Sequence, residues 1–413
     1  MPHASSEQPR RTPTAGVDLA VLRGSSISAE FQPPTKKRAL PHDAAGTPVT
    51  EPSNGNVPDT STDTKASDKM KTSQDEAALS ESSVMDDRTS KDYYFDSYAH
   101  HAIHEEMLKD EVRTKTYEMA IKQNSHLFKD KIVLDVGCGT GVLSMFAAQA
   151  GAKHCYAVDC SAILEQAKKI IKCNGFEQQI TLIRGKVEEI ELPVPKVDII
   201  VSEWMGYFLL YESMLDTVLF ARDKWLVEDG IIFPDKAVMY LTAFEDAHVK
   251  AERIDFWDNV YGFDMSPIKE IAVREPVVDV VDAKALVTDA VPILRLDILT
   301  CTKEDLDFTA AFKLQAQRND YIHGLVAYFE CAFTQVHKPI GFSTAPFARY
   351  THWKQTILYL TETLTICDGE FIEGEITTKK NPKNCRDLDI RLTVDFHGRH
   401  GDLTNHVTDY RLR

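Results

Sequence analysis

Between residues 131 and 233, continuous apolar runs alternate with segments of helical pattern, and this alternation constrains the fold of the 413-residue chain most strongly. Apolar runs of this kind are typical of parallel strands buried on both faces, and each helical segment supplies the crossover to the next strand. The predicted strands are KIVLDVG (131–137), HCYAVDC (154–160), QITLIRG (179–185), VDIIVSE (197–203) and IIF (231–233). We therefore predict an α/β domain with a helix-covered parallel sheet.

The segments on either side of this domain have a different character. Residues 1–90 contain a single aromatic residue, Phe31, and too few apolar side chains to offset the entropy of ordering, which predicts a disordered tail. The α/β domain would span residues 91–234 and begin with N-terminal helices, in a stretch of helical pattern from Tyr98 to about His126. Residues 235–413 are rich in Val, Thr and Phe and predict short, mostly antiparallel strands in a barrel or sandwich. A helical, aromatic stretch at about 247–275 interrupts them.

Charge and cysteine usage narrow the class of protein. The net charge is −16, of which −13 falls on residues 91–413, so a nucleic-acid backbone is not the expected partner and basic partners are favoured. The eight cysteines include no CxxC pair, which predicts reduced thiols without a zinc site. We find neither a signal peptide nor a membrane-spanning apolar run, so we expect a soluble intracellular protein. The group Lys36-Lys37-Arg38 is a short candidate nuclear import signal.

The motif VLDVGCGTG (133–141) lies at the first strand-to-helix turn. Gly137 and Gly139 permit a sharp turn and let a ligand lie against bare backbone. Asp159 ends the second strand, where a carboxylate can accept hydrogen bonds from ribose hydroxyls. The spacing is GxGxG, whereas dinucleotide-binding turns have the spacing GxGxxG, which sets a pyrophosphate on a helix N-terminus. In addition, Asp135 would repel phosphates but suit a cationic ligand. The motif therefore favours S-adenosylmethionine over NAD; alternatively, the glycines serve only a tight turn.

The segment SEWMGYFLLYE (202–212) follows the fourth strand, at the sheet edge where ligands of open α/β folds bind. Glu203 and Glu212 flank an aromatic loop with Gly206 near its turn, so both carboxylates meet in one pocket if the loop doubles back. Two such carboxylates repel each other, and a planar guanidinium with several N–H donors relieves the repulsion better than a lysine. We interpret the pair as a clamp for arginine; alternatively, both are surface charges, with Glu212 starting a helix.

At this point the motifs resemble those of a known family. The carrying segments are YYFDSY (93–98), HEEMLKDEVRT (104–114), VLDVGCGTG, SEWMGYFLLYE and THWKQT (351–356). From about residue 92 to 413 the chain is similar to the type I protein arginine methyltransferases, most closely to their predominant asymmetric-dimethylating type. The resemblance implies a Rossmann-like S-adenosylmethionine-binding domain followed by a β-barrel with a helical dimerisation arm at about 247–275. Interface anchors on that arm would be Phe256, Trp257, Tyr261 and Phe263.

The resemblance also implies roles for single residues. Glu203 and Glu212 would clamp the substrate arginine, while Asp110 and His352 would orient the pocket and carry off the released proton. Met107 and Met214 would crowd the pocket and direct both methyl groups to one nitrogen. The residues expected at the cofactor are Arg113 for its carboxylate, Asp159 for its ribose, Glu188 for its adenine amine, His104, Gly137, Gly139 and Asp135, and Tyr98 in a lid.

We accordingly expect an enzyme that uses S-adenosylmethionine and no metal. Its substrates would be arginine- and glycine-rich protein tails and histones, and it would form a homodimer or larger homo-oligomer. We expect no direct nucleic-acid or membrane partner, and location in nucleus and cytoplasm. The alternatives are a small-molecule methyltransferase on the same fold and a catalytically idle scaffold.

Asp159 departs from the family pattern. Close relatives usually carry glutamate at this position, one methylene longer. The shorter side chain would grip only one ribose hydroxyl, or require a small backbone shift to reach both.

Overall fold

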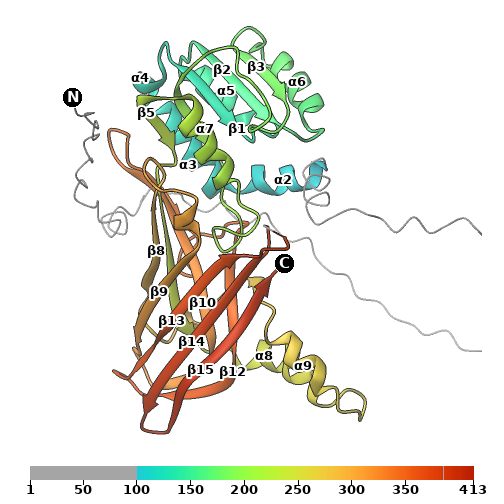
Figure 1. The fold of residues 1–413 in the computed structure, drawn as a ribbon, viewed down its shortest axis with the longest axis vertical. Coiled ribbons are helices and arrows are strands. Elements are labelled where there is room, and N and C mark those ends of the chain that lie inside the picture. Colours follow the sequence, from blue (N-terminus) through green and yellow to red (C-terminus); the bar gives the residue numbers. More distant parts are fainter. Residues whose placement is uncertain (1–99, 385) are drawn as a thin grey trace, which may run out of the picture. The chain divides into compact units, whose positions relative to one another are not determined.

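The computed structural model describes residues 100–384 and 386–413. Its first domain is built on a five-stranded parallel sheet with the order β3-β2-β1-β4-β5 (Figure 1). The strands are β1 (Ile132–Val136), β2 (His154–Asp159), β3 (Ile180–Arg184), β4 (Val197–Ser202) and β5 (Leu226–Phe233). The crossover helices are α5 (Val142–Gln149), α6 (Leu164–Cys173) and α7 (Leu215–Trp225). The predicted alternation of strands and helices is therefore confirmed.

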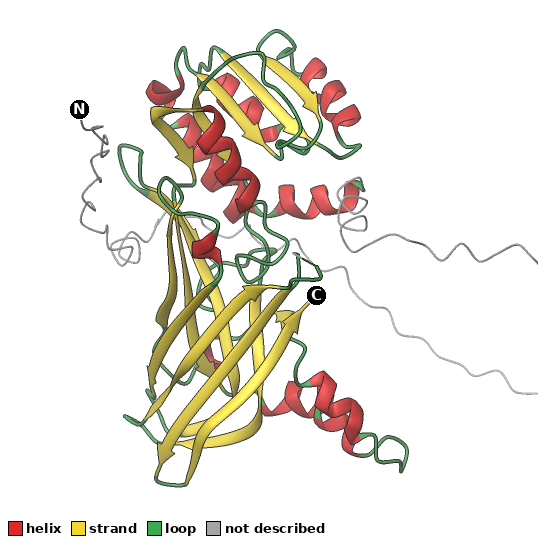
Figure 2. Cartoon of the chain, viewed as in Figure 1, coloured by secondary structure: helices red, strands yellow, loops and turns green. Residues whose placement is uncertain are grey.

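The central strands of this sheet are buried on both faces. Val133 and Leu134 in β1 and Ile200 in β4 have no exposed surface. Figure 2 shows helices on both sides of the sheet, with α5 and α7 on opposite faces. Burying one such side chain stabilises the fold by roughly 1.5–3 kcal/mol. Strands with a continuous apolar sequence are therefore more stable in the centre of the sheet than at its edge.

The N-terminal helical stretch is divided into separate helices. The chain forms α2 (His101–Lys109), α3 (Glu111–Lys122) and a short α4 (Ser125–Phe128). Asp110 separates the first two in an extended conformation, and its carboxylate accepts a hydrogen bond from the backbone N–H of Arg113 at 3.0 Å. Aspartate is a strong N-cap residue because it satisfies a free N–H of the first turn. The helical pattern of the sequence did not mark this break at Asp110.

The second domain is a β-barrel made of two antiparallel sheets. One has the order β7-β12-β10-β6-β8, with β11 paired to β10, and the other the order β15-β14-β13-β9. The strands of the first sheet are β6 (Lys236–Phe244), β7 (Val277–Asp279), β8 (Val291–Asp297), β10 (Asp320–Phe333), β11 (Ile340–Ser343) and β12 (Gln355–Ile366). Those of the second are β9 (Phe308–Gln315), β13 (Phe371–Lys380), β14 (Leu388–Gly398) and β15 (Gly401–Leu412). The hydroxyl of Tyr410 donates to the carbonyl of Tyr359 at 2.8 Å and joins the two sheets.

Several barrel strands are longer than expected. Strand β10 runs for 14 residues and is buried from Ile322 onward, whereas β14 alternates buried and more exposed residues. The alternation identifies β14 as a strand with one face in the core. Complete burial of β10 explains why its sequence lacks this alternation.

The expected boundary at residue 234 lies between the two domains, at a cis peptide bond joining Phe233 to Pro234. From β6 the chain enters the segment 247–275, which forms α8 (Ala247–Arg253), a short 3₁₀ turn (Asp255–Asp258) and α9 (Ser266–Ala272). Three of its four predicted anchors are exposed: Tyr261 by 97%, Phe263 by 69% and Phe256 by 48%. Trp257 is half-buried and packs against Phe256.

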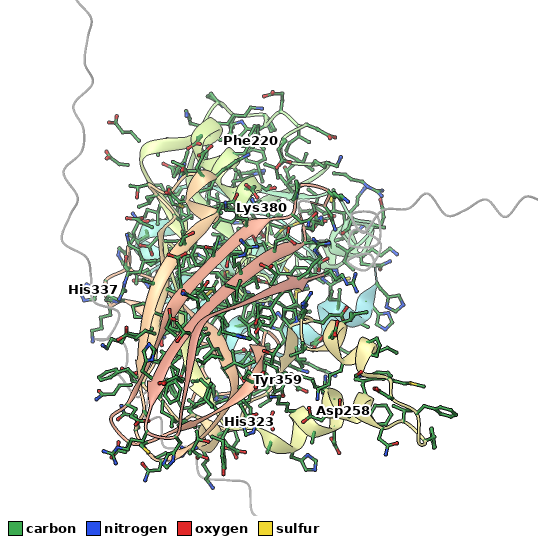
Figure 3. The ribbon with its side chains drawn as sticks, turned by 60° about the horizontal axis from the view of Figure 1, so that its bottom comes forward. Phe220, Asp258, His323, His337, Tyr359 and Lys380 are labelled. Atoms are coloured by element: carbon green, nitrogen blue, oxygen red, sulfur yellow. The ribbon has the colours of Figure 1, made fainter. Side chains whose placement is uncertain are left out.

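The base of this arm is fixed to the barrel. Asp246 caps α8 and accepts a hydrogen bond from the hydroxyl of Tyr359 at 2.7 Å. The backbone N–H of Asp246 donates to Nδ1 of His323 at 3.1 Å. Figure 3 shows His323 and Tyr359 beside the start of the arm and Asp258 farther along it. The arm is therefore anchored at its root, while Phe256, Tyr261 and Phe263 remain exposed.

Some expectations fall on residues that the structure does not describe. These are the tail at 1–90, the candidate import signal, the motif at 93–98 and the lid residue Tyr98. Within the described ranges, no helix combines the length and apolarity that crossing a membrane requires. Nor do the described His, Cys, Asp and Glu side chains gather in threes or more as a metal site would need.

Candidate active site

A cavity of about 440 Å³ lies at the carboxyl ends of the parallel strands. Strands β1 and β4 are neighbours, and their connections leave in opposite directions, which is where open α/β sheets bind their ligands. The loops after four strands contribute to its wall: 137–140 after β1, 159–161 after β2, 185–188 after β3 and 203–207 after β4. The sheet order therefore brings together motifs that are far apart in the sequence.

The glycine turn leaves no room for side chains. Gly137 and Gly139 adopt φ of 74° and 53°, which other residues rarely do. A Cβ on Gly137 would lie 2.4 Å from Cε of Met214, and one on Gly139 would lie 3.2 Å from the ring of His104. Both glycines, His104 and Met214 line the cavity, as the sequence predicted.

Asp135 lies beneath this turn and does not form part of the wall. Its carboxyl is 1% exposed and accepts a hydrogen bond from the hydroxyl of Ser144, on α5, at 2.6 Å. Burial raises the pKa of Asp135 to about 7. Its other oxygen, Oδ1, has no hydrogen-bond partner among the described residues. The predicted direct contact between Asp135 and a ligand is therefore not provided, because the side chain faces α5 instead.

Asp159 and Glu188 both line the cavity. Asp159 accepts hydrogen bonds from the backbone N–H of Gly139 and from Ser161. Glu188 is exposed and accepts a hydrogen bond from the hydroxyl of Thr217 at 2.7 Å. These two carboxylates lie on the neighbouring loops after β2 and β3, so one ligand with two separate hydrogen-bond donors can reach both.

The loop after β4 doubles back as expected. The backbone N–H of Gly206 donates to the carbonyl of Leu209 at 3.0 Å, and that of Met214 donates to the carbonyl of Trp204 at 2.9 Å. A Cβ on Gly206 would lie 1.7 Å from the carbonyl oxygen of Tyr211, so only glycine fits the closed loop. Glu203 and Glu212 consequently line the same cavity as the glycine turn.

Glu203 is paired with an arginine of the chain itself. Nη2 and Nε of Arg113 donate to Oε2 of Glu203 at 2.8 and 3.0 Å. Both side chains are less than 10% exposed, and Nη1 of Arg113 also donates to the carbonyl of Met107. Arg113 and Met107 line the cavity. Sequence reasoning placed Arg113 at the cofactor but missed this ion pair, because its members are 90 residues apart.

Glu212 has a different electrostatic environment. It adopts a φ of 54° and lies in the wall beside Arg386, which the loop between β13 and β14 carries. Burial raises the pKa of Glu212, the charge of Arg386 opposes this, and Asp387 adds to it. Arg386 was not predicted, since nothing in its local sequence connects the barrel loop with the carboxylate pair.

Asp110 and His352 are in direct contact. Nδ1 of His352 lies 2.8 Å from Oδ2 of Asp110, and the backbone N–H of His352 donates to the same oxygen at 2.9 Å. Burial would raise the pKa of Asp110, but the hydrogen bonds from His352 and Arg113 outweigh it and hold that pKa below its ordinary value. The predicted pair therefore forms, and His352 reaches the cavity wall.

The residue after His352 ties the barrel to the carboxylate loop. The indole Nε1–H of Trp353 donates to the carbonyl of Met205 at 3.0 Å. Trp353 is 3% exposed and stacks on Phe342 of the barrel. The loop that presents Glu203 is thus held from the second domain.

Comparison with known proteins gives matches over most of the chain. Residues 133–230 match a model described as a methyltransferase domain, and residues 235–399 match one described as an arginine methyltransferase oligomerization subdomain. The chain is 60% identical over 330 residues to a probable protein arginine N-methyltransferase 1.2 of Arabidopsis thaliana, covering 80% of this chain and 90% of that protein. It is 57% identical over 327 residues to protein arginine N-methyltransferase 1 of Chlamydomonas reinhardtii, covering 79% of this chain and 94% of that protein.

Two solved structures are also similar. One is a Trypanosoma brucei PRMT1 enzyme–prozyme heterotetrameric complex with AdoHcy, with a TM-score of 0.75 and 50% identity over 77% of this chain and 100% of that one. The other is Arabidopsis thaliana protein arginine methyltransferase 10, with a TM-score of 0.71 and 28% identity over 78% of this chain and 100% of that one.

Proposed function

The chain belongs to the protein arginine N-methyltransferases, and from that premise we propose that it forms monomethyl- and asymmetric dimethylarginine in arginine- and glycine-rich protein tails and in histones. It is an S-adenosylmethionine-dependent enzyme that methylates arginine side chains of proteins. The observation that carries the finer proposal is the convergence of Glu203 and Glu212 on the cavity that holds the glycine turn.

The residues of the cavity fit S-adenosylmethionine. The turn at Gly137 and Gly139 offers bare backbone, which a ligand can approach closely, and an added Cβ at either glycine would meet another side chain. Asp159 supplies an acceptor for the ribose, and Glu188 supplies one for an adenine amine. When bound, the cofactor supplies an electrophilic methyl group on a positively charged sulfur.

Glu203 and Glu212 address the weak nucleophilicity of the substrate. The lone pairs of a guanidinium are delocalised, and its pKa lies above about 12. Two carboxylates that accept its N–H donors draw positive charge toward the bonded nitrogens and leave electron density on the reacting one. Holding that nitrogen in line with the methyl carbon contributes roughly 7–11 kcal/mol through positioning. Arg113 fixes Glu203 in this role by occupying one of its oxygens.

Asp110 and His352 are suited to receive the released proton. A guanidinium nitrogen that gains a methyl group must lose one N–H proton, and that proton needs an acceptor in the site. Asp110 holds Nδ1 of His352, which leaves Nε2 as the ring nitrogen able to accept a proton. The negative charge of Asp110 stabilises the imidazolium that results.

The proposed product follows from crowding near the clamp. Met107 and Met214 both line the cavity, one from α2 and the other from the N-terminus of α7. Two flexible thioether side chains restrict how a methylated guanidinium can turn. We expect this restriction to present the same nitrogen twice, which gives asymmetric dimethylarginine.

For assembly we propose a homodimer built through the arm. The match to an oligomerization subdomain covers the whole arm, and the similar Trypanosoma brucei enzyme is a heterotetrameric complex. The exposed aromatic residues Tyr261 and Phe263 are the kind that anchor protein interfaces. We further propose that the protein acts in nucleus and cytoplasm on basic protein tails, without direct nucleic-acid or membrane partners. The charge of −16 supports the choice of basic partners over nucleic acid.

The experiment is incubation of the full chain with S-adenosylmethionine and an Arg-Gly-Gly peptide or a histone tail, followed by mass spectrometry of the hydrolysed arginines. We expect monomethylarginine first and asymmetric dimethylarginine later. Symmetric dimethylarginine would contradict the product assignment. Transfer to small molecules but to neither protein substrate would contradict the substrate class.

A further inference from the structure

Asp159 already has several hydrogen-bond partners within the chain. Its Oδ1 accepts from the backbone N–H and from the hydroxyl of Ser161, each at 2.8 Å. Its Oδ2 accepts from the backbone N–H of Gly139 at 2.9 Å. The carboxylate therefore braces the glycine turn on one side and its own loop on the other.

The remaining hydrogen-bonding capacity of this carboxylate is small. An ionised carboxylate has about four acceptor sites, two on each oxygen. Ser161 uses both sites of Oδ1, and Gly139 uses one site of Oδ2. A single site is left on a side chain that lines the cavity, whereas a ribose presents two adjacent hydroxyl donors.

We propose that Asp159 accepts a hydrogen bond from only one of the two ribose hydroxyls of the cofactor, its other acceptor sites serving to hold the glycine turn. The inference rests on the use of S-adenosylmethionine described above. It resolves the two outcomes that the sequence left open, because a backbone shift that brought both hydroxyls to Asp159 would break the bonds to Ser161 or Gly139.

The first test measures binding and requires no variant. S-adenosylhomocysteine and its 2′-deoxy and 3′-deoxy analogues are titrated into the full chain by calorimetry. A hydrogen bond to a charged group corresponds to about a 10- to 100-fold difference in affinity. We expect one analogue to bind nearly as tightly as S-adenosylhomocysteine and the other at least about tenfold more weakly. An equal loss for both analogues, or no loss for either, would overturn the inference.

The second test moves the carboxylate. In Asp159→Glu the side chain is longer by one carbon–carbon bond of about 1.5 Å, so the carboxylate extends beyond Ser161 and its acceptor sites become free for both hydroxyls. We expect both deoxy analogues to bind this variant at least about tenfold more weakly than S-adenosylhomocysteine. If the variant keeps the one-sided pattern, Asp159 does not determine it.

Asp198→Glu is the matched control. Asp198 lies at the opposite end of the same sheet, where it accepts from the backbone N–H of Ile132 at 2.8 Å, and it does not line the cavity. This variant should retain the wild-type pattern. If S-adenosylhomocysteine itself does not bind the wild type, the proposed function fails. If it binds but both analogues bind equally weakly, only the inference about Asp159 fails.

Discussion

Glu203 accepts hydrogen bonds from Arg113 and is also the proposed partner of a substrate guanidinium. Its Oε2 is occupied by Arg113, so its other oxygen is the one available to the substrate. Arg113 donates twice to Oε2 in a pair that is almost completely buried. Removing one member of a buried pair costs about 3–5 kcal/mol of stability, because the other charge is left uncompensated. Glu212 carries no such pairing with Arg113, which makes it the cleaner residue for testing the clamp.

We predict that Glu212→Gln lowers kcat for a peptide substrate by at least about 100-fold, the loss typical of removing one group that stabilises transition-state charge. The affinity for S-adenosylhomocysteine should change little, since Glu212 is proposed to bind substrate only. Steady-state kinetics and calorimetry provide the two readouts. The exposed Glu177 offers a control, and Glu177→Gln should leave both unchanged. Normal turnover by Glu212→Gln would remove this residue from the clamp.

A second prediction concerns Asp135 and pH. Its pKa is about 7 in the folded protein and 3.8 ordinarily, so the folded state retains a proton that the unfolded chain releases within this window. Stability should therefore fall as pH rises through the window. Asp135→Asn buries no charge and should lack this fall. The difference in the free energy of unfolding between Asp135→Asn and the wild type should therefore grow with pH, to an upper bound of roughly 4 kcal/mol above pH 7.

Urea unfolding of the wild type and Asp135→Asn, followed at about pH 5 and pH 8 without ligand, checks this sign. A stability difference that stays constant, or one that reverses at high pH, would show that Asp135 is ionised in the fold.

At the scale of single elements, the loop between β4 and α7 depends on one close approach. A Cβ on Gly206 would overlap the carbonyl oxygen of Tyr211, so Gly206→Ala should open the loop and separate the two carboxylates. We predict a loss of turnover of about 100-fold or more, with binding of S-adenosylhomocysteine preserved. Gly401→Ala is the control, because nothing lies within 4 Å of its added Cβ. Full activity in Gly206→Ala would mean that the loop tolerates rearrangement.

The predictability of each element depended on how local its signal was. The turn at Gly137 and the loop at Gly206 are marked by adjacent residues, so both could be predicted. The break at Asp110 had a local signal as well, an aspartate three residues before the N–H that it caps, but helix propensity on both sides concealed it. No local sequence signal indicated that Arg113 would lie beside Glu203 or Arg386 beside Glu212, because only tertiary packing brings these residues together.

At the scale of the whole molecule, the arm at 247–275 is the segment through which we propose that the chain assembles. Tyr261 and Phe263 are more exposed than aromatic side chains of monomeric proteins usually are. We predict that deleting 247–275 gives a monomer with little activity, and that Tyr261→Glu with Phe263→Glu weakens the assembly without unfolding the barrel.

Analytical ultracentrifugation measures the assembly state of these variants, and a peptide methylation assay measures their activity. Tyr321→Glu is a control, since Tyr321 is 54% exposed but belongs to β10. A fully active monomer would contradict the proposed link between assembly and activity.

The contact between Asp110 and His352 joins residues 242 positions apart. A nascent chain that has left the ribosome only as far as β5 already contains Glu203 and Glu212. It still lacks His352, and it lacks Trp353, whose indole holds the carbonyl of Met205. A fragment that ends at β5 would therefore lack both the proposed proton acceptor and one contact that holds the carboxylate loop, so we expect it to transfer no methyl groups.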